Sequence, residues 1–255
     1  MAEKFNSDGV EIAFEQWGAG EPILLIHGFA SNRYTNWRDT GWVKALSAAG
    51  RTVIAFDNRG HGESAKLYDT SLYSAPLMAA DARRLLDHLQ IKKTAVMGYS
   101  MGARISAFLT MQHPERVSCA IFAGLASRMI TGVGGSEAIA AALEAENLAD
   151  IPEREARGFR IFADSTKSDR RALAACIRSN RIRIDADSLA KISTPVLVVA
   201  GELDEVAGNV AGLTSVIPGA RGVELPGRNH MNAVGDLGYK AAVLEFLANV
   251  EMSGS

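Results

Sequence analysis

The sequence contains few cysteines and almost no excess charge. Cys119 and Cys176 are its only two cysteines, so no disulfide framework is implied, and a reducing compartment suits the chain. Cys119 stands inside an apolar run, where a buried structural thiol is expected rather than a reactive one. A formal net charge of -2 over 255 residues gives no electrostatic reason to expect nucleic acid or an anionic membrane as a partner.

Long apolar runs and a leader pattern are also missing. No run approaches the roughly 20 apolar residues that cross a bilayer, and the first ten residues lack the basic-then-apolar order of a signal peptide. The five histidines are scattered and no H-x-x-x-H or C-x-x-C pairing occurs, so no metal is expected. We therefore expect a cytoplasmic protein with no membrane partner, no metal and no other cofactor.

Short apolar runs alternate with helical patterns along most of the chain. Such alternation is typical of an α/β fold, a mostly parallel twisted sheet with helices on both faces. An antiparallel strand is expected first, and continuously apolar buried strands follow it. The expected strands cover 10–17, 22–28, 52–57, 94–99, 117–124, 194–201 and 221–227. The expected helices cover 42–49, 75–89, 101–112, 205–216 and 234–250.

Residues 125–191 interrupt this alternation. They form helical, Ala- and Arg-rich segments without a convincing strand, and the stretch is too long for an unstructured loop in a compact domain. We interpret it as an inserted helical cap, with residues 1–124 and 192–255 forming the core domain. Two additional crossover helices lying on the sheet are the alternative.

The string G-Y-S-M-G, residues 98–102, indicates a nucleophile. Ser100 directly follows a predicted buried strand and precedes a predicted helix, which is the context that this motif requires. An abrupt strand-to-helix turn presents the hydroxyl outward on a strained backbone, and glycines at 98 and 102 avoid crowding there. The following helix directs its N-terminal N–H groups at the group that Ser100 attacks.

A serine hydroxyl needs a base that accepts its proton, and five histidines are available. His27 and His61 stand in short glycine-containing loops, where structural roles are expected. His88 falls on a polar helix face, and His113 precedes a proline near a helix end. His230 remains, in a loop between the last expected strand and the last expected helix, where functional groups gather in such folds. We predict that His230 is the base.

An acid must orient this imidazole, and the strand at 194–201 leads directly into E-L-D-E. The candidates are Glu202, Asp204 and Glu205. The chain order Ser100, acid, His230 matches one of the known orders of a catalytic triad.

Six motifs in this order resemble the α/β-hydrolase family over nearly the whole chain. They are H-G-F-A (27–30), D-N-R-G-H-G-E-S (57–64), G-Y-S-M-G (98–102), Q-H-P-E-R-V (112–117), G-E-L-D (201–204) and N-H (229–230). The resemblance implies an eight-stranded sheet and selects Asp204 as the acid. It also implies that the backbone N–H groups of Phe29 and Met101 form the oxyanion hole. In the family, Asp57 and Arg59 fix a structural loop.

The reaction follows from the residue at the turn. Related dehalogenases and epoxide hydrolases place Asp there, whereas Ser100 suits acyl transfer. We expect a serine carboxylesterase-type hydrolase that cleaves a small to medium ester or thioester through an acyl-enzyme. A C–C bond hydrolase acting on a vinylogous keto acid with the same triad is one alternative. A non-enzymatic ligand receptor on the same fold is another.

Substrate choice and oligomeric state remain open from the sequence. The side chains of Phe29 and Met101 are expected to form apolar walls of the pocket, and Tyr34, Trp37 and Met129 are further candidates for its lining. Arg33 and Arg38 lie in the loop 31–41, where one of them could bind an anionic substrate, although an exposed surface arginine is the simpler interpretation.

Overall fold

The strands lie close to the positions that the apolar runs predict, with one addition. The computed structural model describes residues 2–254. The additional strand is β1, which buries only Phe5 and Ser7 of its five residues and so carries no apolar run. The strands are β1 (Glu3–Ser7), β2 (Val10–Gly18), β3 (Glu21–Ile26), β4 (Arg51–Phe56), β5 (Thr94–Tyr99), β6 (Val117–Ala123), β7 (Val196–Gly201) and β8 (Arg221–Leu225).

All eight strands form one sheet in the order β1-β2-β4-β3-β5-β6-β7-β8. β2 pairs antiparallel with β1 and β4, and every other neighbouring pair is parallel. The predicted mostly parallel, eight-stranded α/β fold is therefore confirmed. The strand order reverses at β3, with β4 on one side of it and β5 on the other, and ligands bind at such switch points in α/β sheets.

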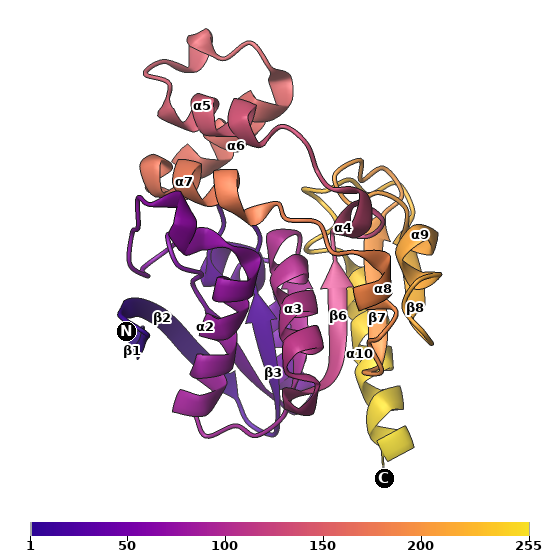
Figure 1. The fold of residues 1–255 in the computed structure, drawn as a ribbon. Helices are drawn as coiled ribbons and strands as arrows, with labels where there is room; N and C mark the ends of the chain where they lie inside the picture. Colours follow the sequence, from indigo (N-terminus) through magenta and orange to yellow (C-terminus); the bar gives the residue numbers. More distant parts are fainter. Residues whose placement is uncertain (1, 255) are drawn as a thin grey trace.

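Helices cover both faces of the sheet (Figure 1). Buried side chains of α1 and α10 join the apolar core on one face, and those of α2, α3, α8 and α9 join the core on the other. The helices of this part are α1 (Trp42–Ala48), α2 (Ala75–His88), α3 (Met101–Gln112), α8 (Ala186–Leu189), α9 (Val210–Thr214) and α10 (Leu237–Gly254). The helix expected over 205–216 is shorter than predicted, because it begins only after Asn209, whose side chain caps its first turn.

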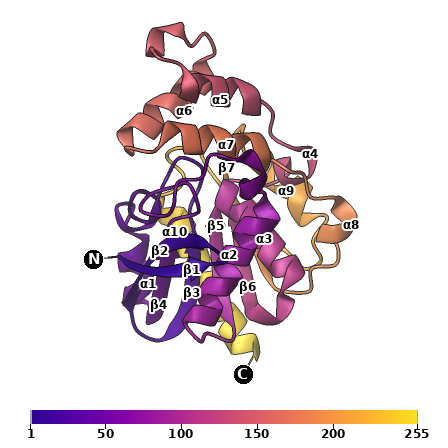
Figure 2. The same cartoon turned by 60° about the vertical axis from the view of Figure 1, so that its left-hand side comes forward.

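Between β6 and β7 the chain is helical, and the described residues of this stretch contain no strand. Its first four α-helices are α4 (Arg128–Thr131), α5 (Ser136–Glu144), α6 (Arg154–Ser165) and α7 (Arg170–Asn180). We call α5, α6 and α7 the cap helices, since both views show them above the edge where the parallel strands end (Figures 1 and 2). The division into a core domain and a cap domain remains a prediction.

The cap helices are attached to the sheet layer by side-chain hydrogen bonds. Thr166 Oγ1 donates to the carbonyl oxygen of Ala30 at 2.9 Å, and Tyr68 Oη donates to Asp169 Oδ2 at 2.9 Å. Within the cap, Arg178 on α7 pairs with Glu137 and Glu144 on α5. These contacts place the cap helices over the loops that follow β3 and β4.

Among the described residues, no helix is both long and apolar enough to cross a bilayer.

Cys119 and Cys176 are both buried free thiols. Burial raises the pKa of Cys119 to about 11, as expected for an unreactive structural thiol.

Candidate active site

Ser100 occupies the turn between β5 and α3 in a strained backbone conformation. Its φ is 56° and its ψ is -112°, a region that residues with a side chain rarely adopt. A Cβ at Gly98 would overlap the carbonyl oxygen of Gly102, and a Cβ at Gly102 would overlap that of Ile26. The two motif glycines therefore allow the close backbone approach that this turn requires.

Ser100, His230 and Asp204 form one continuous hydrogen-bonded chain. The imidazole Nε2 of His230 lies 3.0 Å from Ser100 Oγ, and its Nδ1 lies 2.8 Å from Asp204 Oδ2. Asp204 is only 4% exposed, and its Oδ1 also accepts from the N–H of Ala207. Because an ionised carboxylate can only accept, Nδ1 carries the proton in this pairing. The lone pair of Nε2 therefore faces the serine hydroxyl.

The loop of His230 is fixed by its own side chains. The N–H of Asn229 donates to Asn232 Oδ1 at 2.8 Å, and the N–H of Asn232 donates back to Asn229 Oδ1 at 3.1 Å. Asn229 Oδ1 also accepts from the N–H of Met231. These reciprocal bonds hold the turn that presents the imidazole, so its position does not depend on the contact with Ser100 alone.

Two backbone N–H groups beside Ser100 are available to a ligand. Within the described residues, neither the N–H of Phe29 nor that of Met101 donates to a protein acceptor. Met101 is the first residue of α3, so its N–H belongs to the unpaired helix N-terminus. Phe29 follows Gly28, where an added Cβ would lie only 3.5 Å from that of Ser100. The pair fits the geometry of an oxyanion hole.

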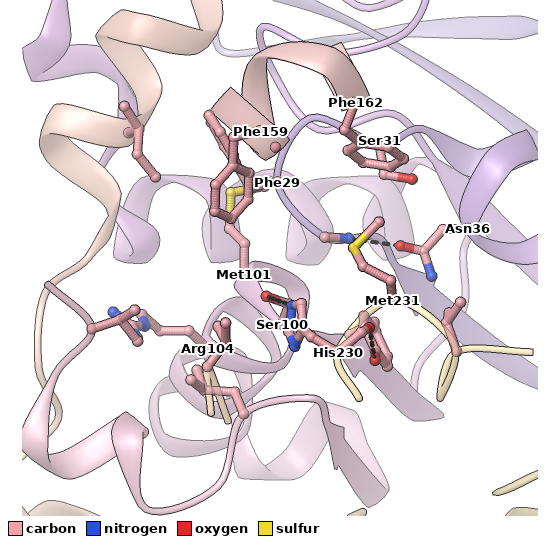
Figure 3. Close-up of a pocket in the computed structure, with 18 of the residues that line it drawn as sticks. Phe29, Ser31, Asn36, Ser100, Met101, Arg104, Phe159, Phe162, His230 and Met231 are labelled. Atoms are coloured by element: carbon pink, nitrogen blue, oxygen red, sulfur yellow. Dashed lines mark hydrogen bonds between the residues drawn. The ribbon is translucent and has the colours of Figure 1, made fainter. Parts of the chain in front are cut away.

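A cavity of about 520 Å³ opens at Ser100 beneath the cap helices. Figure 3 shows Phe29, Met101, Phe159 and Phe162 on one side of Ser100, and Met231 and Asn36 on another. The full lining comprises Gly28, Phe29, Ser31, Thr35, Asn36, Thr40, Tyr99, Ser100, Met101, Arg104, Leu125, Val133, Glu155, Gly158, Phe159, Phe162, Ile177, Arg181, Val206, His230, Met231 and Val234. Apolar walls around a few polar groups are typical of a small-molecule site.

A family model described as the alpha/beta hydrolase fold matches residues 21–161 of this chain. The chain belongs to the α/β-hydrolase fold family. The match begins at β3 and ends within α6, so it includes the strand and turn of Ser100.

Relatives of this α/β hydrolase carry several activities in their names. A non-heme chloroperoxidase of Kitasatospora aureofaciens is 39% identical over 95 residues, which cover 37% of this chain and 33% of that protein. An epoxide hydrolase of Caballeronia sordidicola is 34% identical over 125 residues, covering 49% of this chain and 36% of that protein. The matched segments thus span about a third of these relatives' own length.

A solved structure of a hydrolase from Pseudomonas aeruginosa matches along most of the chain. It is 25% identical, covers 96% of this chain and 98% of its own, and has a TM-score of 0.80. The likeness of this α/β hydrolase to a known structure therefore extends over most of the chain beyond residue 161, where the match to the family model ends.

The loop 57–64 is held by buried polar contacts outside the cavity lining. The guanidinium of Arg59 binds both carboxylate oxygens of Asp81, each at 2.7 Å. His61 Nδ1 lies 2.9 Å from the Arg59 carbonyl oxygen. Burial lowers the pKa of His61 to about 3 and that of His27 to about 4, so both rings stay neutral. Neither ring competes with His230 as a base.

Three of the predicted lining residues lie away from the cavity. The guanidinium groups of Arg33 and Arg38 lie 4.2 Å and 4.1 Å from the ring centroid of Tyr34, and its Oη donates to Glu15. Trp37 is fully buried against Trp42 in the core that α1 and α10 join. Met129 is likewise fully buried, in the core on the other face of the sheet, which α2 and α3 join. The prediction that Tyr34, Trp37 and Met129 line the pocket is wrong. None of the three borders the cavity, because each packs against other residues of the protein.

The two arginines of the 31–41 loop have protein partners as well. Arg33 is fully buried and forms an ion pair with Asp57, which also accepts from its backbone N–H. Arg38 pairs with Asp39 at the surface. Arg33 is thus a structural residue rather than the exposed surface arginine of the simpler interpretation.

The sequence reasoning missed the lining residues that the cap supplies. Phe159 and Phe162 on α6 face the cavity, and their i, i+3 spacing places them on one helix face. This spacing is visible in the sequence and predicts that both rings lie on one helix face. It does not distinguish a face that lines a cavity from one that packs into the core. Arg104 and Arg181 were also missed, although Arg104 stands one helical turn after Ser100.

Proposed function

We propose that this α/β hydrolase is a serine hydrolase that cleaves a small to medium carboxylic ester or thioester. The observation that carries the proposal is the chain from Ser100 Oγ to His230 Nε2 at 3.0 Å and from His230 Nδ1 to Asp204 at 2.8 Å. A serine, an imidazole and a buried carboxylate in this order form a nucleophile, its base and the group that orients the base.

The reaction would proceed in two steps through an acyl-enzyme. Ser100 Oγ attacks the ester carbonyl while its proton moves to His230 Nε2, and Asp204 stabilises the resulting imidazolium. The N–H groups of Phe29 and Met101 bind the oxyanion, where losing one donor typically costs about 2.7–4 kcal/mol. The imidazolium then protonates the departing alcohol or thiol. Water, deprotonated by His230, cleaves the acyl-enzyme and restores Ser100.

The names of relatives favour a second use of the same acyl-enzyme. If hydrogen peroxide replaces water in the second step, the products are free Ser100 and a peracid. The peracid can then oxidise a halide to hypohalite and return to the carboxylic acid. The chloroperoxidase relative motivates this candidate, which requires a carboxylic acid or ester, peroxide and halide as co-reactants.

An active-site probe tests the nucleophile directly. A fluorophosphonate should label the wild-type protein and leave Ser100→Ala unlabelled. If the wild type is not labelled, the enzyme proposal fails and a ligand receptor on this fold is favoured. Labelling that persists in Ser100→Ala would show that another residue is the nucleophile.

A substrate panel tests the reaction. Short p-nitrophenyl esters and acyl thioesters should be hydrolysed by the wild type and not by Ser100→Ala. Turnover of a dienol acid with none of any ester or thioester would favour the C–C hydrolase. Bromination of a 1,3-diketone, measured with acetate, bromide and peroxide and again without acetate, tests the second candidate, which requires an acetate-dependent rate.

A further inference from the structure

Arg104 lies one turn of α3 after the candidate nucleophile and lines the same cavity. Its backbone N–H donates to the carbonyl oxygen of Ser100 at 3.3 Å, which places the two residues on one side of the helix. In Figure 3 Arg104 lies on the opposite side of Ser100 from Asn36. Arg104 is only 3% exposed, which is unusual for an arginine without a carboxylate partner.

The guanidinium of Arg104 is only partly satisfied by the protein. Its Nη1 donates to the carbonyl oxygen of Ile182 at 2.9 Å. Its Nε is buried without any partner, and no acidic side chain in the described part of the chain pairs with Arg104. The edge formed by Nε and Nη2 is thereby left without a protein acceptor. Because Nε is shielded from the cavity, Nη2 is the N–H group of this edge that a carboxylate in the cavity can reach.

The other charged groups of the cavity leave this positive charge unbalanced. Arg181 donates to the carbonyl oxygen of Gly134, and its guanidinium lies 6.0 Å from the ring centroid of Phe159. Glu155, the one acidic residue in the cavity lining, attracts Arg181 and raises its pKa, although burial lowers that pKa more. Burial, and then repulsion from Arg181, lowers the pKa of Arg104 to about 10, so the group remains charged at pH 7.

We propose that Arg104 binds a carboxylate of the substrate, so that the preferred substrate is a half-ester or half-thioester of a dicarboxylic acid. This inference rests on the proposed function. Ser100 fixes the position of the reacting carbonyl, and Arg104 stands one helical turn, about 6 Å, further along α3. Both residues line the same cavity from one turn of the same helix, so the acyl chain between the reacting carbonyl and the carboxylate is expected to be short.

A matched pair of substrates tests the subsite. p-Nitrophenyl butyrate and mono-p-nitrophenyl succinate share a leaving group and a similar acyl length, and only the succinate ester carries a carboxylate. The wild type should have a kcat/KM at least tenfold higher for the succinate ester. Arg104→Met should reduce this preference at least tenfold, and kcat/KM for the butyrate ester, measured beside it, corrects for any general loss of activity in the variant. Arg104→Lys should retain part of the preference.

An arginine outside the cavity supplies the control. Arg221 on β8 is 54% exposed, and Arg221→Met should leave the succinate preference unchanged. An unchanged preference in Arg104→Met, or no preference in the wild type, would overturn the proposal. A measurement on the wild type avoids any folding defect of the variants: added salt should raise KM for the succinate ester and not for the butyrate ester.

A binding measurement separates this proposal from the hydrolase proposal. Calorimetric titration of Ser100→Ala with glutarate should give saturable binding that is lost in Ser100→Ala/Arg104→Met, whereas butyramide should bind neither. If fluorophosphonate labelling and ester turnover fail but this binding is found, the hydrolase proposal falls and the subsite stands. If turnover is found but glutarate does not bind and the esters are not distinguished, the subsite falls and the hydrolase stands.

Discussion

The side chain of Tyr99 is hydrogen-bonded to the backbone of His230, with Tyr99 Oη donating to the His230 carbonyl oxygen at 2.7 Å. The tyrosine ring also lies against the imidazole, with ring centroids 5.4 Å apart. Burial, and then the charge of Asp204, raises the pKa of Tyr99 well above its ordinary value, so its hydroxyl stays a donor. The residue directly before the candidate nucleophile therefore holds the loop of the candidate base.

Tyr99→Phe keeps the ring and removes this hydrogen bond. We expect kcat/KM for an ester to fall about three- to tenfold, because the imidazole is less firmly placed, and the free energy of unfolding to fall by about 1 kcal/mol. Tyr73→Phe is the control, since Tyr73 Oη also donates to a backbone carbonyl, that of Leu67, at 2.7 Å, and accepts from the N–H of Leu67 at 3.2 Å. It should lose at least as much stability in urea unfolding without the kinetic loss. Equal kinetic losses in both variants would contradict a specific role of Tyr99.

Asp204→Asn tests how the base is oriented and charged. The amide retains the size of the side chain but cannot stabilise the imidazolium that forms when His230 accepts the serine proton. We expect kcat to fall by roughly 10²–10⁴-fold, less than in Ser100→Ala or His230→Ala, with little change in KM. Glu205→Gln removes a neighbouring exposed carboxylate and should leave kcat unchanged. A kcat above a tenth of wild type in Asp204→Asn would remove Asp204 from the proposed triad.

Elements whose signals are local were predictable from the sequence. The strand at 94–99 and the helix at 101–112 agree with β5 and α3 at both ends, because a fully apolar run, a glycine-bounded serine and a helical pattern stand side by side. β1 was not predictable in this way. It is a short edge strand, and pairing with β2 rather than an apolar pattern makes Glu3–Ser7 extended.

The cavity lining was far less predictable than the triad. Asp204 and His230 follow β7 and β8, and the sheet brings such strand ends together whatever the cap does. The lining instead depends on which faces of α6 and α7 turn inward. An aromatic residue such as Trp37 fits the core as well as a pocket, and only the fold shows that it packs against Trp42.

The buried histidines of the loops after β3 and β4 should make stability depend on pH. In the folded protein the pKa of His27 is about 4 and that of His61 about 3, mainly through burial, against about 6.5 in an unfolded chain. Below pH 6.5 the unfolded chain therefore binds more protons. Stability from these groups is complete above pH 6.5 and is lost as the pH falls towards 4 and 3. Each histidine contributes up to about 1.4 kcal/mol per pH unit in that window.

Urea unfolding between pH 7.5 and pH 4.5 measures this dependence. His61→Gln removes one of the two protons, so its free energy of unfolding should fall less steeply with decreasing pH than that of the wild type. Ser64→Ala is the control for lost stability, because Ser64 is buried in the same loop, donates to the Asp57 carbonyl oxygen and does not titrate. It should lower stability by a similar amount at every pH. An unchanged pH slope in His61→Gln would show that this histidine is not kept neutral by the fold.

Because the turn at Ser100 is strained, glycine there should stabilise the protein relative to alanine, whereas within a helix glycine destabilises it. At its φ of 56° a side chain is unfavourable, so Ser100→Gly should be more stable than Ser100→Ala by about 1 kcal/mol, or roughly 2–4 °C in Tm. Ser106 lies within α3, where glycine is unfavourable, and Ser106→Gly should be less stable than Ser106→Ala by a similar amount. Calorimetry of the four variants measures both differences. If glycine lowers Tm at both positions, the turn stores no strain, and the conformation of Ser100 costs the fold nothing.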